Sequence, residues 1–230
     1  SAASDVYKRQ ELGQLLGGEV IRAVAVKFGF GQACAVAPGL KSSAGILPDL
    51  QSLENAGQLA LFSFGQGDLS ATPLQITAMM NTVADGGTYH TPRFVYGITN
   101  ASQTLDEPVQ IPEDEPVLAA DTARILRDML QSVVRDGIGR EAAPQEEEAG
   151  GKTGTAQTGQ FDTSGEELLN YWFSGFYPAD EPRYTITVLQ DGILEPEVSS
   201  AAIFRKIADS LQVLMTAETV QPPETAAKSS

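Results

Sequence analysis

The chain has 230 residues, of which 42% are hydrophobic, so it can fold as one large domain or two small ones. Its 30 acidic and 15 basic side chains give a formal charge of −15, which would repel phosphate backbones and anionic lipid surfaces. Nucleic acid is therefore not an expected partner.

The single cysteine, Cys34, cannot form an internal disulfide, and no cluster of Cys and His residues has the spacing of metal ligands. We therefore predict no metal site and no cofactor. No apolar run approaches the roughly 20 residues that span a bilayer, and the N-terminus lacks the layout of a signal peptide. Either the protein is soluble or its targeting segment lies outside this chain.

Residues 1–10 are polar and have no periodic apolar face, so we expect a non-native or truncated end there. A helix is predicted from about residue 11 to Phe28, with Gly29 as its stop. The apolar residues that recur at helical spacing, and that should pack on a core, are Leu12, Leu15, Leu16, Val20, Ile21, Val24 and Phe28. Residues 30–53 are rich in Gly, Pro and Ser and should be irregular, with one short strand.

An apolar run at 59–64 leads into a glycine turn at 65–67, and a sharp helix signal follows. Thr72 is the predicted N-cap, Pro73 the first helical residue, and Gln75 the residue that closes a capping box. The predicted buried face of this helix is Leu74, Ala78, Met79, Thr82 and Val83. Gly86 and Gly87 should end the helix.

The middle of the chain predicts a hairpin and a further helix. Residues 93–99 and 109–111 are its expected strands, and 113–116 is an expected charged turn. A helix is predicted over 118–135, with Asp136-Gly137 as its stop. Its expected buried residues are Ile125, Leu126, Met129, Leu130 and Val133.

The C-terminal third predicts an antiparallel sheet, with strands at 151–157, 171–177 and 184–190. A helix over 199–215 should cover it, with Ile203, Ile207, Leu211 and Leu214 on its buried stripe. Residues 216–230 are polar and contain prolines, so a disordered tail is expected. The predicted fold class is α+β, an antiparallel sheet with packed helices.

The stretch 150–159 places one lysine, Lys152, among glycines, threonines and an alanine. This composition indicates a strand whose edge is bare enough for another backbone to lie against it. A phosphate loop would need a glycine at position 146, where the chain has Glu146, followed by two more glutamates. The remaining alternative from the residues alone is a solvated lysine that protects a sheet edge.

Other candidate residues have simpler interpretations. His90 is the only histidine and lies in a turn, which favours a structural role over that of a general base. Cys34 has no adjacent lysine or histidine to lower the pKa of its thiol, so it should be a small apolar filler. The run from Glu146 to Glu148 should be a solvated loop, because three consecutive carboxylates cannot all face one cation in an extended chain.

Several ordered motifs together resemble the transpeptidase domain of penicillin-binding proteins, most like the class B, monofunctional enzymes. The similar segments are Phe28-Gly29-Phe30-Gly31-Gln32, Ser63-Phe64-Gly65-Gln66-Gly67 with Thr72-Pro73-Leu74-Gln75, Asn81 to Pro92, Lys152-Thr153-Gly154-Thr155 and Trp172 to Pro178. The fold is thus expected to be β-lactamase/transpeptidase-like. The resemblance covers residues 11–215, taken as a partial, N-terminally truncated transpeptidase domain.

The resemblance implies acyl transfer by a serine nucleophile with Ser-x-x-Lys, Ser-x-Asn and Lys-Thr-Gly motifs. No serine stands three residues before a lysine or two before an asparagine in this sequence, so the nucleophile is absent and the chain as given should be inactive. Lys152 would supply positive charge, and the Thr153 and Thr155 hydroxyls would bind the substrate carboxylate. Gly154 would let the substrate backbone approach, and the backbone N–H of Thr155 would form half of an oxyanion hole.

The implied ligands are D-Ala-D-Ala stem peptides of peptidoglycan and β-lactams, with cell-wall or division proteins as further partners. The complete protein would lie on the outer face of the cytoplasmic membrane, with its anchor in an N-terminal part outside this chain. Two alternatives stay open: a β-lactamase or β-lactam sensor of the same fold, and a non-catalytic relative that binds a peptide or partner through the same sheet edge.

Overall fold

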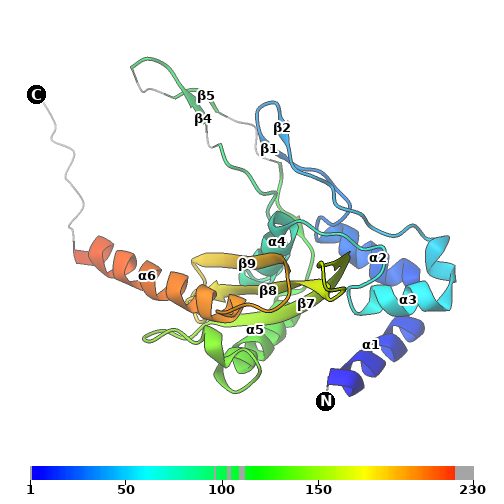
Figure 1. Ribbon diagram of the computed structural model, residues 1–230. Coiled ribbons are helices and arrows are strands. Elements are labelled where there is room, and N and C mark those ends of the chain that lie inside the picture. The colour runs from blue at the N-terminus through cyan, green and yellow to red at the C-terminus, as the bar shows by residue number, and fades with distance from the viewer. Residues whose placement is uncertain (1, 96, 103–104, 109–111, 221–230) are drawn as a thin grey trace, which may run out of the picture.

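A computed structural model describes residues 2–95, 97–102, 105–108 and 112–220 (Figure 1). It combines helices with an antiparallel sheet, as the α+β prediction required. The helices are α1 (Ala2–Leu16), α2 (Gly18–Lys27), α3 (Ala56–Ser63), α4 (Pro73–Ala84), α5 (Ala120–Arg135) and α6 (Ser200–Val220), with 3-10 turns at Ser52–Glu54 and Arg140–Ala142. The strands are β1 (Ala35–Ala37), β2 (Leu40–Lys41), β3 (Thr88–Tyr89), β4 (Gly97–Thr99), β5 (Leu105–Pro108), β6 (Glu115–Pro116), β7 (Gly150–Phe161), β8 (Glu167–Tyr177) and β9 (Tyr184–Ile193).

The main sheet has the order β7-β8-β9 with antiparallel pairing throughout, which confirms the three predicted C-terminal strands. Alternate residues of β8 pack on its two faces. Phe173 is fully buried, and its ring centroid lies 4.8 Å from that of Phe204 in α6. Phe176 is buried against Met80 and Ala84 of α4. Helices α6 and α4 therefore cover opposite faces of the sheet (Figure 1).

The buried stripe of α6 differs from the prediction. Its core residues are Ala201, Phe204, Ala208 and Met215. Ile207 and Leu214, which the sequence placed on the stripe, are 38% and 58% exposed. The ring of Phe204 fills the gap beside Phe173, and this packing sets the rotation of the helix. The helix also continues to Val220, so residues 216–220 are helical and not tail; residues 221–230 lie outside the described part.

The N-terminal helical segment also needs correction. Two helices meet at Gly17, whose φ of 79° breaks the single helix that was predicted. Helix α1 includes residues 2–10. Several apolar side chains expected in a core are instead exposed, namely Leu12, Leu15, Leu16, Val20 and Val24. The segment is anchored at its end, where Phe28 is 9% exposed, and at Gly13, which packs closely against Ser63 of α3.

The capping box of α4 is present as predicted. The Thr72 hydroxyl accepts from the Gln75 backbone N–H, and the Gln75 side-chain oxygen accepts from the Thr72 N–H. The Gln75 amide nitrogen also donates to the backbone carbonyls of Gly29 and Ala44, at 3.0 and 2.9 Å. Gln75 and Met80 are buried, whereas Leu74 is only half-buried, because the glutamine ties the helix to two preceding loops.

The remaining segments match the sequence-based predictions in part. The apolar run before the glycine turn is helix α3, and residues 30–53 contain a small hairpin of β1 and β2. The predicted hairpin is present as β4 and β5, but its second strand precedes residues 109–111, which lie outside the described part. The expected charged turn contains β6, which pairs with β3. Helix α5 buries Ala123 and Val134, while the expected core residues Ile125 and Met129 are 46% and 60% exposed.

Among the described residues, no helix has the length and apolar character of a membrane span.

Candidate active site

Strand β7 carries all the residues predicted for the site, and in the described part of the chain it pairs with β8 alone. We call its other side the free edge. The register is regular from Gly150 opposite Phe176 to Gln157 opposite Leu169. Lys152 therefore lies opposite Ser174. This arrangement confirms the expected edge strand.

Two glycines hold the start of β7 tightly against the core. A Cβ atom on Gly150 would lie 2.3 Å from the ring of Phe176, and one on Gly151 would lie 2.6 Å from the ring of Phe173. Both distances are shorter than real contacts allow, so the aromatic rings occupy the space that side chains would need. The glycines therefore fix the position of the residues that follow, beginning with Lys152.

Gly151 and Gly175 show which backbone groups lie between β7 and β8. A Cβ on Gly151 would lie 2.8 Å from the carbonyl oxygen of Ser174, and one on Gly175 would lie 2.5 Å from that of Gly150. Both oxygens therefore lie between the two strands. Hydrogen-bonding direction alternates along an antiparallel pair, so residues 150, 152 and 154 bond to β8. Thr153 and Thr155 consequently direct their backbone N–H and C=O groups toward the free edge.

The side chain of Lys152 wraps around that edge. Its ammonium donates to the Thr153 carbonyl oxygen at 3.1 Å and to the Thr153 hydroxyl at 3.3 Å. Consecutive strand residues project to opposite faces of a sheet, so the ammonium reaches a hydroxyl on the face opposite its own Cβ. It can do so only by passing around the free edge. Lys152 is half-buried there.

Gly154 and Thr155 are open to a ligand in a way that Gly150 and Gly151 are not. A Cβ on Gly154 would lie 3.4 Å from the Trp172 Cβ, an ordinary van der Waals contact. The packing of this chain therefore does not itself require glycine at 154. Thr155 is exposed, and its N–H points to the free edge beside the wrapped lysine. The structure thus places Lys152, Thr153, Gly154 and Thr155 together on one accessible strand edge.

Behind Lys152, a chain of hydroxyls joins the sheet to α4. Thr77 donates to the Thr187 hydroxyl at 2.8 Å, and Thr187 shares a hydrogen bond of 2.8 Å with Ser174. Ser174 is 5% exposed and lies directly opposite Lys152. None of these three residues was predicted from the sequence as part of the site. Thr185 and Thr187 alternate with Ile186 and Val188, and this alternation was the available signal for a polar face toward α4.

His90 lies outside this edge and bridges two carboxylates. Its Nε2 lies 2.6 Å from Asp85 and its Nδ1 lies 2.6 Å from Asp114. The hydrogen bond with Asp85 is the main cause that raises the pKa of His90; burial lowers this pKa, and Asp114 raises it again. The histidine therefore fastens the segment before α5 to the end of α4.

The other candidate residues from the sequence do not belong to the β7 edge. Cys34 is half-buried with its thiol 3.4 Å from the Ser42 hydroxyl. Glu146 to Glu148 are exposed, as expected for a solvated loop. No group of His, Cys, Asp and Glu side chains suited to a metal ion occurs within the described residues.

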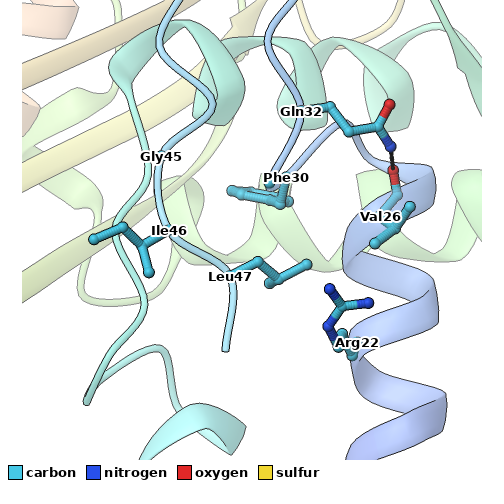
Figure 2. A pocket seen from close by; sticks show the side chains of 8 residues that line it. Arg22, Val26, Phe30, Gln32, Gly45, Ile46 and Leu47 are labelled. Carbon is cyan, nitrogen blue, oxygen red and sulfur yellow. Dashed lines mark hydrogen bonds between the residues drawn. The ribbon is translucent and has the colours of Figure 1, made fainter. Parts of the chain in front are cut away.

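A pocket of about 550 Å³ lies between α2 and the segments at 30–32 and 45–47 (Figure 2). Arg22 is fixed at its wall because its Nε donates to the Pro48 carbonyl oxygen at 2.8 Å. Gln32 donates to the Val26 carbonyl oxygen at 3.0 Å on the same wall. None of the predicted site residues lines this pocket, so it is separate from the β7 edge.

Comparison with known proteins identifies relatives along nearly the whole chain. Residues 2–209 match the family model of the penicillin binding protein transpeptidase domain. The chain is 36% identical over 217 residues to penicillin-binding protein PbpB of Mycolicibacterium smegmatis, a match that covers 87% of this chain and 32% of that protein. It is 28% identical over 165 residues to peptidoglycan D,D-transpeptidase MrdA of Haemophilus influenzae, covering 66% of this chain and 25% of MrdA.

The fold also matches a solved structure. The crystal structure of penicillin binding protein 3 from Mycobacterium tuberculosis complexed with aztreonam gives a TM-score of 0.77 at 32% sequence identity. That match covers 94% of this chain and 50% of the other. The chain therefore spans about half of that solved structure, and about a third or less of the curated relatives named above.

Proposed function

Since this chain belongs to the penicillin-binding protein transpeptidase family, we propose that its free β7 edge is one side of a peptidoglycan D,D-transpeptidase site. The proposed ligands are D-Ala-D-Ala stem peptides and β-lactams. The observation that carries the proposal is the direction of the Thr155 backbone N–H, which points to the free edge beside Lys152. The relative named as a D,D-transpeptidase and the aztreonam complex support it.

Each residue of the stretch has a distinct part in this proposal. Lys152 supplies a positive charge that attracts the ligand carboxylate, and the hydroxyls of Thr153 and Thr155 bind that carboxylate. Gly154 presents no side chain, so the ligand backbone can lie close to β7. The Thr155 N–H donates to the oxyanion that forms when a nucleophile attacks the ligand carbonyl. The ligand would thus lie along β7 as an added strand.

The nucleophile is the missing part of the reaction. Acyl transfer in this family proceeds through a serine of a Ser-x-x-Lys motif, helped by a Ser-x-Asn motif, and neither pattern occurs in the 230 residues. We therefore propose that the chain as given binds its ligands without forming a covalent bond. The site of the complete protein would face peptidoglycan outside the cytoplasmic membrane, with cell-wall or division proteins as partners.

Labelled penicillin tests this proposal. The chain is incubated with the label, denatured and separated by size, so that only covalently attached label stays with the protein. We expect no attached label, and we expect unlabelled D-Ala-D-Ala peptide to compete with reversible penicillin binding before denaturation. Label that survives denaturation would contradict the missing nucleophile. Reversible binding that K152M and G154V leave unchanged would contradict the β7 site.

The free edge of β7 also fits a second candidate, a non-catalytic relative that binds a peptide through the same edge. The two candidates differ in whether a nucleophile is supplied to the edge. The complete coding sequence distinguishes them, because a Ser-x-x-Lys motif within it supports the enzyme and its absence supports the peptide-binding relative.

A further inference from the structure

The backbone groups of Thr153 are the first ones on the free edge that an added strand would meet after Lys152. Both its N–H and its C=O point away from β8, as the alternation along β7 requires. A strand that pairs with an edge needs such a carbonyl as an acceptor and such an N–H as a donor. Pairing at this position therefore depends on whether the Thr153 carbonyl is accessible.

In the structure that carbonyl is occupied by the chain itself. The Lys152 ammonium lies 3.1 Å from the Thr153 carbonyl oxygen and 3.3 Å from the Thr153 hydroxyl. Because it reaches the Thr153 hydroxyl on the face opposite its own Cβ, it crosses the free edge beside this carbonyl. This is the place that the N–H of an added strand would take. The ammonium therefore competes with the N–H of a paired strand for this carbonyl.

We propose that Lys152 is a latch on the free edge of β7, and that a strand pairs at Thr153 only after the ammonium has left the carbonyl. The identity of the ligand strand rests on the proposed function, but the latch itself rests only on these contacts. Lysines at sheet edges commonly oppose pairing with other chains, and here the protective lysine is also the site lysine.

A carboxylate on the ligand is what opens the latch. A free carboxylate attracts the ammonium more strongly than a neutral backbone carbonyl does, because both partners are then charged. A peptide that ends in a carboxylate therefore draws Lys152 away from Thr153 as it binds. A peptide whose terminus is neutral must displace the ammonium without that compensation.

The latch is tested without any ligand, through pairing of the edge with a second copy of the chain. K152M keeps the apolar stem of the lysine and removes the ammonium, while K152R keeps a cationic donor of similar reach. In the double variant K152M/T153P, proline removes an N–H that faces the free edge and so leaves the bonds to β8 intact. Sedimentation velocity over a range of protein concentrations measures association, and circular dichroism verifies that each variant is folded.

We expect K152M to associate at a concentration roughly tenfold lower than the wild type, because its edge is open. K152R should behave as the wild type, and K152M/T153P should return to wild-type association. Amide hydrogen exchange should slow at Thr155 in associated K152M, since its N–H faces the paired edge. Association of K152M equal to that of the wild type would overturn the latch. So would association that persists in K152M/T153P, because it would then use another surface.

The outcome is separate from that of the proposed function. Failure of D-Ala-D-Ala peptide to bind would contradict the proposed function and leave the association result unchanged. Equal association of all the variants would contradict the latch but would not contradict the proposed peptide site.

Discussion

The ring of Phe173 on β8 fills the space beside Gly151 on β7, where a Cβ atom would lie 2.6 Å from the nearest ring carbon. Phe173 is fully buried, and its ring packs on Phe204 from the other side. It therefore has little room to move away. The aromatic ring and the glycine together set how closely β7 approaches the core, one residue before Lys152.

Substituting Gly151 should consequently destabilise the fold, whereas substituting Gly154 should not. We expect G151A to lower the free energy of unfolding by about 1–3 kcal/mol, as overpacking of a tight core does. G154A is the matched control, because its Cβ would make an ordinary contact 3.4 Å from Trp172. Urea unfolding of both variants measures the difference. Equal losses in the two variants would contradict the packing described for the start of β7.

The stripe of α6 that faces the sheet is tested by two substitutions one turn apart. Phe204 is fully buried, and F204A should lower the free energy of unfolding by about 3–5 kcal/mol, since it leaves a cavity beside Phe173. Ile207 is 38% exposed, so I207A should cost less than about 1 kcal/mol. Thermal or urea unfolding gives both values. A larger loss of unfolding free energy from I207A would indicate that Ile207 lies on the buried side of α6, as the sequence predicted.

Gln75 joins the start of α4 to two loops through buried hydrogen bonds to Gly29 and Ala44. Q75L removes the amide and leaves these carbonyl groups without that donor, at an expected cost of about 2–3 kcal/mol. Q160L on an exposed part of β7 is the control and should be nearly neutral. Chemical unfolding measures both variants, and a stability of Q75L within error of the wild type would show that these bonds contribute little.

His90 should make stability depend on pH. Its pKa in the folded chain is raised, mainly by the hydrogen bond with Asp85. The charged imidazole therefore stabilises the fold fully below its unfolded pKa of about 6.5, and this contribution is lost as pH rises through the higher folded pKa. Because the side chain is 39% exposed, solvent screens the effect and it should be modest.

The comparison of wild type with H90N isolates this contribution. The wild type should have the higher melting temperature near about pH 6, and the two should converge near about pH 9. Measurements at a series of pH values remove effects that both proteins share. A difference that stays constant across the series would show that the histidine bridge does not titrate as its contacts with Asp85 and Asp114 require.

Local signals in the sequence were sufficient for the three strands of the main sheet and for the α4 cap. A capping box depends on residues three apart, and an edge strand with alternating glycines depends on its own composition, so both can be predicted from short segments. The four residues of the candidate site followed from one such segment, Lys152 to Thr155. Their shared position on a free edge is found in the structure as expected.

The features that could not be predicted from the sequence depend on tertiary contacts. Periodicity placed Ile207 on the buried side of α6, but the fit of the Phe204 ring against Phe173 rotates the helix away from it. Gly17 and Gly18 form a double glycine, which commonly breaks a helix, but the prediction followed the apolar periodicity that continues on both sides of it. The wrapping of Lys152 depends on which backbone groups face β8, and this alternation is fixed by strand pairing rather than by composition.

The most direct test of the proposed site follows the backbone amides of β7 by NMR during titration with N-acetyl-D-Ala-D-Ala. The N-acetyl-L-Ala-L-Ala peptide is the matched control, because it has the same charge and composition. We expect the D,D peptide, but not the L,L peptide, to shift the amide signals of Thr153, Gly154 and Thr155, with the largest change at Thr155. Shifts that are equal for both peptides, or that centre on the pocket at Arg22 instead, would contradict a D-Ala-D-Ala site on the β7 edge.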